Sequence, residues 1–254
     1  MTFLLSDIAP AQTIAEAASR FPLGMETIRF SIGSVLDNAE AELKNFQGEQ
    51  KHMLDEKKIS MHGPFLDLIP TSYDPAVRET ARRRFQCAYD CAKKLGVRKI
   101  IYHSGFLPRP YGFGDWLAQS VSFWTEFLRE KDDSIVICVE NVFDPEPEPL
   151  AQLADAVGHP ALGLCLDIGH ANVMSGQPAE QWIDVFGSRT RHVHLHNNFG
   201  KQDTHSGFSS GSMDILNLLS RLQKSTPSFS AALEISDATE LSDSLGQLSA
   251  AGLL

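Results

Sequence analysis

Histidines are concentrated in one short stretch of this chain, and their spacing suggests chemistry. Four of the nine histidines lie in RHVHLHNNFGKQDTHSG, residues 191–207, and three of them alternate as His192, His194 and His196. In a β-strand alternate side chains share a face, so these three imidazoles would point one way and the intervening apolar residues the other. Imidazole transfers protons near neutral pH and is the commonest metal ligand in proteins. The pattern therefore predicts proton transfer or metal binding.

Acidic residues and further histidines end other apolar runs in the same way. Carboxylates held bare within a few ångströms repel one another, which raises their pKa values unless cations lie between them. Carboxylate and neutral imidazole ligands together suit zinc, manganese or a similar divalent ion. We therefore predict a metal site from residues that end six successive runs: His62, His103, Glu140, Asp167 with His170, His194 with His196, and Glu234.

Eight short apolar runs alternate with amphipathic stretches along the 254 residues. The runs are TFLLSD, METIRFS, KISMHG, RKIIYHSG, SIVICVEN, LGLCLDIG, RHVHLH and SAALEIS. Eight strand–helix units predict one (β/α)8 barrel, the TIM-barrel fold, as a single domain over residues 1–254 rather than an open doubly wound sheet. Helices are expected at Ala11–Arg20, Leu36–Glu56, Asp74–Leu95, Gly114–Glu130, Glu148–Val157, Pro178–Phe186, Met213–Leu222 and Thr239–Ala250.

The barrel assigns a direction to each strand residue. Active sites of such barrels lie at the C-terminal ends of the strands, so the predicted metal donors would share one rim. Counting back by two from each donor gives a mostly small set that suits the barrel interior, namely Ser60, Ile101, Cys138, Cys165, His192 and Ala232. The alternate positions should pack under the helices, namely Met61, Tyr102, Val139, Leu166, Val193 and Leu233.

The composition indicates which classes of molecule are unfavourable binding partners for this protein. Lys and Arg number 22 against 32 Asp and Glu, and the formal net charge of −10 disfavours nucleic acid and anionic membranes. The opening MTFLLSDIAP lacks a basic segment and is too short for a signal peptide, and no stretch approaches the ~20 apolar residues of a membrane span. We expect a cytoplasmic protein whose four scattered cysteines are buried thiols rather than disulfides.

The order of several segments resembles the xylose isomerase-like TIM-barrel superfamily, which includes endonuclease IV and many sugar or sugar-phosphate isomerases and epimerases. The resemblance runs from about Lys58 to Ser236, through MHGPFLDL, RFQCAYDCAKKLGVRKIIYHSG, CVEN, GLCLDIGHA, HVHLHNNFGKQDTHSG and ALEI. It implies one to three zinc or manganese ions. The ligands it implies are His62, His103 and Glu140 for a first metal, Glu140, Asp167, His194 and Glu234 for a central metal, and His170, Asp203 and His205 for a third.

Two reaction types are compatible with these ligands. In a metal-dependent isomerase or epimerase of a small sugar or sugar phosphate, Glu140 or Glu234 would move a proton α to a metal-polarised carbonyl. In an endonuclease IV-like phosphoesterase, three metals would generate a hydroxide nucleophile and neutralise the phosphate. The set of ligands favours the second, but the acidic chain disfavours a DNA substrate, and we therefore favour the first. A non-catalytic metal- or ligand-binding barrel is the third alternative.

Loop residues near the predicted rim are candidates for contacting the substrate. These candidates are Phe65, Arg109, His196 and Lys201, whereas His192 is expected to be structural. Well-understood sugar epimerases of the family commonly present an arginine in the loop after the seventh strand, where this chain has Lys201 and Asp203 instead. Ser212 is expected to cap the helix that follows this loop. The sequence does not specify the oligomeric state.

Overall fold

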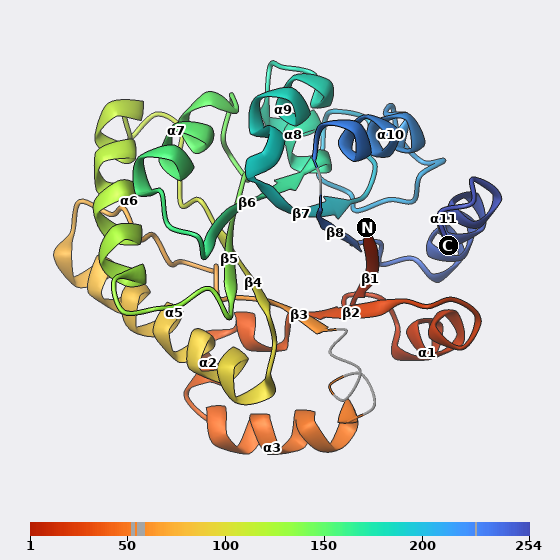
Figure 1. The fold of residues 1–254 in the computed structure, drawn as a ribbon, viewed down its shortest axis with the longest axis horizontal. Helices are drawn as coiled ribbons and strands as arrows, with labels where there is room; N and C mark the ends of the chain where they lie inside the picture. The colour runs from red at the N-terminus through yellow and green to blue at the C-terminus, as the bar shows by residue number, and fades with distance from the viewer. Residues whose placement is uncertain (52–53, 55–58, 227) are drawn as a thin grey trace.

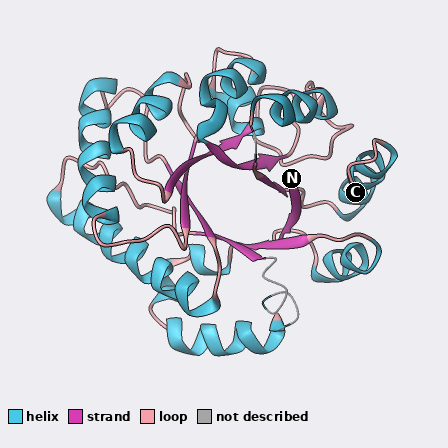
Figure 2. Cartoon of the chain, viewed as in Figure 1, coloured by secondary structure: helices cyan, strands magenta, loops and turns pink. Residues whose placement is uncertain are grey.

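Eight parallel strands close into a barrel in the computed structural model, which describes all residues except 52–53, 55–58 and 227 (Figure 1). The strands pair in chain order, and β8 returns to pair with β1. Figure 2 shows the helices as an outer ring around the strands. The predicted (β/α)8 TIM barrel is therefore confirmed.

The strands are short, and each lies inside one of the eight predicted apolar runs, except that β2 and β7 begin one residue earlier, at Gly24 and Thr190. Neighbouring strands are in parallel register throughout, with one shift between Leu164 and Cys165 where β6 pairs with β7. The strands are β1 Thr2–Ser6, β2 Gly24–Thr27, β3 Ile59–His62, β4 Lys99–His103, β5 Val136–Glu140, β6 Leu162–Asp167, β7 Thr190–Leu195 and β8 Ser230–Leu233.

The described helices follow the strands in order. They are α1 Ala11–Arg20, α2 Gly33–Leu36, α3 Ala39–Glu49, α5 Pro75–Leu95, α6 Phe113–Leu128, α7 Glu148–Val157, α8 Ile168–Met174, α9 Ala179–Phe186, α10 Ile215–Ser225 and α11 Ala238–Ala250, with 3-10 turns η1 Arg29–Ser31 and η2 Gly187–Arg189. The expected bounds of α1 and α7 match those observed, and α8 was not predicted.

The expectation of one helix over Leu36–Glu56 is wrong at its start. The chain breaks between α2 and α3 at Asp37 and Asn38, where Asn38 leaves the helical region at φ −118°. Arg84 of α5 stabilises this break, because its guanidinium donates to the Gly33 carbonyl (3.0 Å) and to the Asp37 carboxylate (2.6 Å). The expected end at Glu56, like the expected start of the resemblance at Lys58, lies outside the described residues.

Caps fix where α5 and α10 begin. Asp74 caps α5 by accepting from the Ala76 amide, Pro75 occupies the first turn, and the left-handed Gly96 ends the helix. The expected Ser212 cap of α10 is wrong. Because α10 begins only at Ile215, Asp214 is the cap and accepts from the Asn217 amide (3.0 Å).

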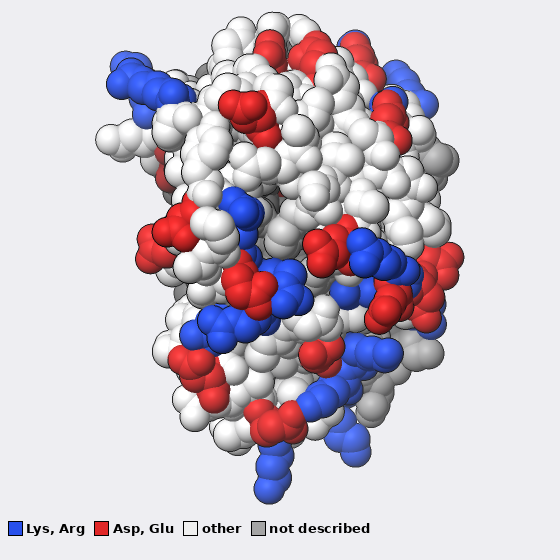
Figure 3. Space-filling view, turned by 90° about the vertical axis from the view of Figure 1, so that its left-hand side faces the viewer, with Lys and Arg blue, Asp and Glu red and all other residues white. Residues whose placement is uncertain are grey.

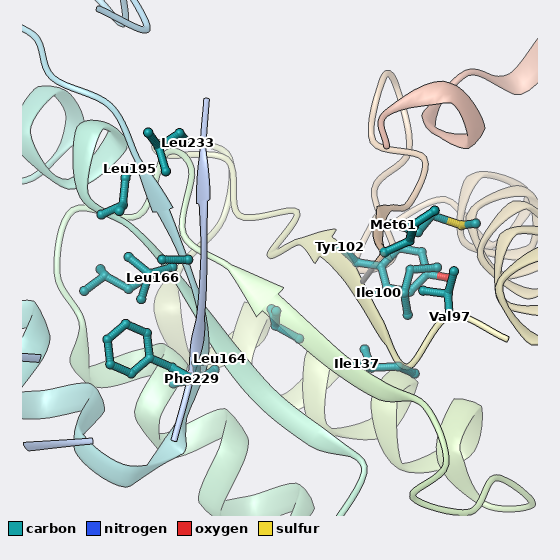
Figure 4. Packing of buried hydrophobic residues seen from close by; sticks show 14 of the residues in the cluster. Met61, Val97, Ile100, Tyr102, Ile137, Leu164, Leu166, Leu195, Phe229 and Leu233 are labelled. Carbon is teal, nitrogen blue, oxygen red and sulfur yellow. The ribbon is translucent and has the colours of Figure 1, made fainter. Parts of the chain in front are cut away.

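The two faces of the strands pack into two separate buried layers. Met61, Tyr102 and Leu166 belong to the large cluster between strands and helices, and Figure 4 shows them beside Ile100 and Leu195. A second cluster fills the barrel interior with Ile101, Cys138 and Cys165. The predicted alternation of strand residues between interior and helix-facing layers is therefore confirmed at these positions.

The outer surface mixes charges of both signs. On the face presented by α5 and α6, basic and acidic side chains are interspersed (Figure 3), and Arg82 pairs there with Glu79 at 2.7 Å. An extended basic groove would be needed for a nucleic-acid backbone, and this face does not carry one. None of the described helices is long and apolar enough to cross a membrane.

Candidate metal centre

The closed barrel gathers the predicted donors at one end. His62, His103, Glu140 and Asp167 are the last residues of β3, β4, β5 and β6, His194 lies one residue before the end of β7, and Glu234 follows β8. Parallel strands present their carboxyl ends at the same rim. The donor atoms consequently fall into compact groups in which every candidate ligand atom lies within 4.8 Å of the others.

The first donor group consists of His62, His103 and Glu140. Glu140 Oε2 lies 3.2 Å from His62 Nε2 and 3.5 Å from His103 Nε2. Phe65 covers this group, stacking on His103 at 4.5 Å between ring centroids and meeting His62 edge-on at 5.0 Å. The structure thus brings together the residues expected for a first metal and places an apolar wall beside them.

The central donor group consists of Glu140, Asp167 and His194 together with Glu234, which lies close to His194 and forms a further compact group with Asp167 and His196. His194 Nδ1 lies 3.2 Å from Glu140 Oε1, 3.5 Å from Asp167 Oδ2 and 3.6 Å from Glu234 Oε2. All four side chains are buried. Three carboxylates from different strands therefore converge on one imidazole nitrogen, as expected for a shared cation.

The third donor group contains His170, Asp203 and His205 and one further member, His196. Asp203 Oδ2 lies 3.1 Å from both His170 Nε2 and His205 Nε2, and Asp203 Oδ1 lies 3.6 Å from His196 Nδ1. The His196 ring stacks on His205 at 4.0 Å. His196 was expected to contact substrate, but the structure places it within this donor group.

A short helix positions two of these groups. Asp167 ends β6 and also caps α8, accepting from the His170 amide at 2.7 Å, so one turn carries donors of the central and third groups. Asn141, directly after β5, locks this turn: its side chain accepts from the Asp167 amide (2.8 Å) and donates to the Asp167 carbonyl (2.9 Å). The side-chain amide of Asn141 therefore fixes β5 and β6 to each other at the rim.

Two carboxylates of the site, Glu140 and Asp167, have lowered pKa values. Burial acts to raise the pKa of Glu140, but the charge of His194 and hydrogen bonds with His170 and His194 outweigh it and hold the pKa well below its usual value. Burial opposes ionisation of Asp167 as well, yet the charges of His170 and His196 keep its pKa well below the ordinary range. Both groups are thus ionised at neutral pH and available to a cation.

The imidazoles differ in charge state. Burial lowers the pKa of His103 to about 3, so this ring is neutral at physiological pH and keeps a free lone pair. For His205 burial acts in the same direction, but a hydrogen bond to Asp203 and the charge of Glu234 raise its pKa to about 9. Metal binding releases protons from the ligands, so a cation bound between Asp203 and His205 would replace the proton of this imidazole.

The donor set fits a divalent cation by two criteria. Mixed carboxylates and imidazoles suit zinc or manganese. Within the described residues, His196 Nδ1 and Asp203 Oδ1 are buried polar atoms that lack a hydrogen-bond partner. Such atoms are costly to leave unsatisfied, and coordination of a cation by the third donor group would satisfy both.

A cavity of about 460 Å³ opens over the first donor group. Its described lining includes none of the other three substrate candidates, Arg109, His196 and Lys201, but it does include Phe65. The lining consists of Ile8, Ile28, His62, Phe65, His103, Glu140, His170, Asp203, Thr204, His205, Glu234 and Ser236. Ile8 and Ile28, which follow β1 and β2, were not predicted.

Glu26 is the principal polar residue that the sequence analysis missed. It lies in β2, is fully buried inside the barrel, and approaches His192 and His194. The available signal was an acidic residue inside the apolar run METIRFS, whose position predicts an inward direction once the barrel is assumed. The run METIRFS does not end in His, Asp or Glu, so it lacks the terminal donor residue that marks the other runs.

Asp144, in the loop after β5, provides a pH-dependent contribution to stability. Burial raises its pKa to about 6 from 3.8, although the Ser104 hydroxyl (2.7 Å) and the Val142 amide (2.9 Å) both donate to Oδ2. A carboxyl with a raised pKa stabilises the fold below its unfolded pKa, and this contribution is lost as pH rises through the folded value. Asp144→Asn preserves the acceptor oxygen and should remove this dependence.

We expect the free energy of unfolding of the wild type, relative to that of Asp144→Asn, to fall between about pH 4 and pH 6 and to level off above. Urea titrations of both proteins in the presence of chelator measure this difference. Asp133→Asn, at an exposed carboxylate, is the control. A wild-type-minus-variant difference that stays constant over the same pH range would contradict the assignment.

The chain belongs to the xylose isomerase-like TIM barrel family, whose model matches residues 23–250. An uncharacterised protein of Methanocaldococcus jannaschii is 29% identical over 180 residues, which cover 66% of this chain and 61% of that protein. A probable endonuclease 4 of Mycobacterium leprae is 24% identical over 169 residues, which cover 61% of this chain and 65% of that protein. The matched segment thus spans just under two thirds of each of these curated relatives.

Solved structures share the whole barrel. A D-tagatose 3-epimerase-like protein superposes with a TM-score of 0.80 at 22% identity, covering 98% of this chain and 96% of that one. A Thermus thermophilus protein soaked with zinc chloride superposes with a TM-score of 0.74 at 25% identity, covering 98% of this chain and 97% of that one. The resemblance in fold that the sequence analysis expected is therefore confirmed.

Proposed function

We propose that this protein is a divalent-metal-dependent isomerase or epimerase of a small sugar. One observation carries the proposal: Glu140 and Glu234 both line the 460 Å³ cavity, and both approach the same nitrogen of His194. Two carboxylates at one metal site, facing a cavity of sugar size, are what proton transfer α to a carbonyl requires. The D-tagatose 3-epimerase-like neighbour supports the proposal through its fold.

In this proposal the central donor group would hold the cation. A divalent ion bound there would supply Lewis-acid chemistry to the oxygens of the substrate. Glu140 or Glu234 removes the proton from the carbon next to the carbonyl, and the same carboxyl or its counterpart returns it. Phe65 lies over the first donor group and restricts the access of water.

The cavity favours an uncharged sugar over a phosphorylated one. In the described part of the chain its lining contains no lysine or arginine, whereas Ile8, Ile28 and Phe65 give it an apolar wall. Phosphate recognition in proteins relies mainly on Arg, Lys and backbone amides. The hydroxyls of Thr204 and Ser236 suit the hydroxyls of a sugar.

A trinuclear phosphoesterase of the endonuclease IV type is the second candidate function. The observation that favours it is that all three expected donor groups are assembled within one rim. The Mycobacterium leprae relative named as a probable endonuclease 4 points the same way. The net charge of −10 opposes a polyanionic substrate.

Hydrogen exchange separates the two candidates. Protein loaded with zinc or manganese is incubated in D2O with a panel of ketohexoses, and proton NMR follows deuterium at the carbon next to the carbonyl. We expect deuterium incorporation for at least one ketose and no incision of a duplex containing an abasic site. Incision without exchange would replace the isomerase proposal with the phosphoesterase one.

A further inference from the structure

The interior of the barrel contains a buried polar cluster directly below the central donor group. Its members are Glu26 of β2, Ser60 of β3, and His192 and His194 of β7. Glu26 and both histidines are completely inaccessible to solvent, and Ser60 is 3% exposed. The proposed reaction uses only His194 of these four, so the other three lack a role in it.

Glu26 is the hub of this cluster. Its Oε2 accepts from the Ser60 hydroxyl at 2.6 Å and lies 3.0 Å from His192 Nε2, while its Oε1 lies 2.9 Å from His194 Nε2. His192 Nε2 and His194 Nε2 have no hydrogen-bond partner among the described residues, so their contacts with Glu26 are close ion-pair contacts rather than aligned hydrogen bonds. Glu26 is therefore the polar group that each of these nitrogens faces at close range.

The acceptor character of a carboxylate determines which nitrogen of His194 carries a hydrogen. An ionised carboxylate only accepts, so Nε2 of His194 must be the protonated nitrogen that faces Glu26. A cation bound where Glu140, Asp167 and Glu234 converge would displace the second ring hydrogen, so that Nδ1 would present its lone pair to that side. A carboxylate behind a metal-binding histidine fixes the orientation of the ring and makes its free nitrogen more basic.

The rest of the cluster holds Glu26 in place. His192 Nδ1 lies 2.7 Å from the Ser230 hydroxyl, and Lys99 donates to the same hydroxyl and to the Arg191 carbonyl. This chain of contacts extends from the start of β4 and β8 to Glu26. The structural role expected for His192 is thus specific, since it supports one oxygen of the carboxylate while Ser60 holds the same oxygen from β3.

We propose that Glu26 is a positioning residue of the metal centre, holding the His194 ring so that Nδ1 faces the other members of the central donor group. This inference rests on the metal centre of the proposed function but not on which reaction occurs there. Glu26 touches neither the cavity nor the substrate, and it acts through His194.

Zinc affinity tests the proposal without reference to turnover. Zinc binding to the chelator-stripped protein is measured by competition with a chromophoric chelator for the wild type, Glu26→Gln and Ser60→Ala. We expect Glu26→Gln to weaken one zinc site by about 10- to 100-fold without changing the number of ions bound at saturation. Ser60→Ala leaves the carboxylate and its contact with His194 in place, so it should change the affinity by less than about tenfold, the lower end of the range expected for Glu26→Gln.

Two further measurements keep the test decisive. Glu26→Asp retains the charge but shortens the side chain, so it should give an intermediate loss of affinity if Glu26→Gln fails to fold. Imidazole nitrogen NMR of the zinc-loaded wild type should show His194 with a proton on Nε2 and zinc on Nδ1. The reverse assignment, or unchanged zinc affinity in the folded Glu26 variants, would overturn the proposal. Tight zinc binding that depends on Glu26, without proton exchange into any ketose, would instead count against the proposed reaction alone.

Discussion

Glu140→Gln is expected to reduce turnover of any ketose that exchanges hydrogen in the assay above by about 10²- to 10⁴-fold. This is the range for loss of a positioned acid or base. The bound zinc should also fall by at least one ion per chain. Glu140 belongs to both the first and the central donor groups, and its carboxylate approaches His62, His103, His170 and His194. Glutamine conserves the shape but lacks the negative charge that two cations would share.

Glu234→Gln separates catalysis from metal binding. Glu234 is absent from the first donor group and approaches His194 at 3.6 Å and His205 at 3.7 Å. We therefore expect a comparable loss of turnover with a smaller loss of zinc than for Glu140→Gln, because Glu140 belongs to two donor groups. Glu146→Gln, in the loop after β5, changes the same charge outside the donor groups and is the matched control. Metal analysis and the exchange assay provide the readouts. Full activity in either site variant would eliminate that residue as the acid or base.

Much of the site could be predicted because the order of the strands along the chain is also their order around the barrel. Side chains alternate between the two faces of a strand, so the last inward-facing residue of each strand lies at the C-terminal rim. His103 pairs directly with Glu140, and His62 pairs with Ile101, two residues before His103, so three strand ends in the sequence become three neighbours in space. That inference needs no knowledge of side-chain conformation.

The rest of the site depends on tertiary contacts, which a local sequence pattern does not predict. His196 lies beyond the end of β7, so its partners depend on how the following loop folds back, which the bridge between Asn197 and Ser206 decides. The loop places Asp203 and His205 against His196. Helix α8 was missed because its seven residues, IGHANVM, carry too few apolar repeats to show an amphipathic period.

His196 alters the expected chemistry of the third donor group. Three protein ligands and one open position are typical of catalytic zinc, whereas four protein ligands close the coordination shell and are typical of structural zinc. With His196 included, the third donor group offers four side chains. A closed third site would stabilise the loop after β7 without activating water, which is consistent with an isomerase and unfavourable to the phosphoesterase alternative.

Gly169→Ala is expected to disrupt this third donor group. A Cβ atom at position 169 would lie 1.9 Å from His196 Cε1 and 2.3 Å from His196 Nδ1. The ring cannot retreat, because His205 stacks on it at 4.0 Å and Asp167 lies 3.0 Å from its Nε2. Alanine in a helix gains at most about 1 kcal/mol over glycine, whereas overpacking a buried site costs about 1–3 kcal/mol.

We therefore expect Gly169→Ala to lower the free energy of unfolding by about 1–2 kcal/mol, the clash outweighing the helix preference, and to remove one zinc per chain. Gly176→Ala is the matched control, because a Cβ atom there meets nothing within 4 Å. Urea denaturation and metal analysis of both variants provide the comparison. If Gly169→Ala kept all its zinc and its stability, His196 would not be fixed against α8, and the closed four-ligand arrangement of the third donor group would have to be abandoned.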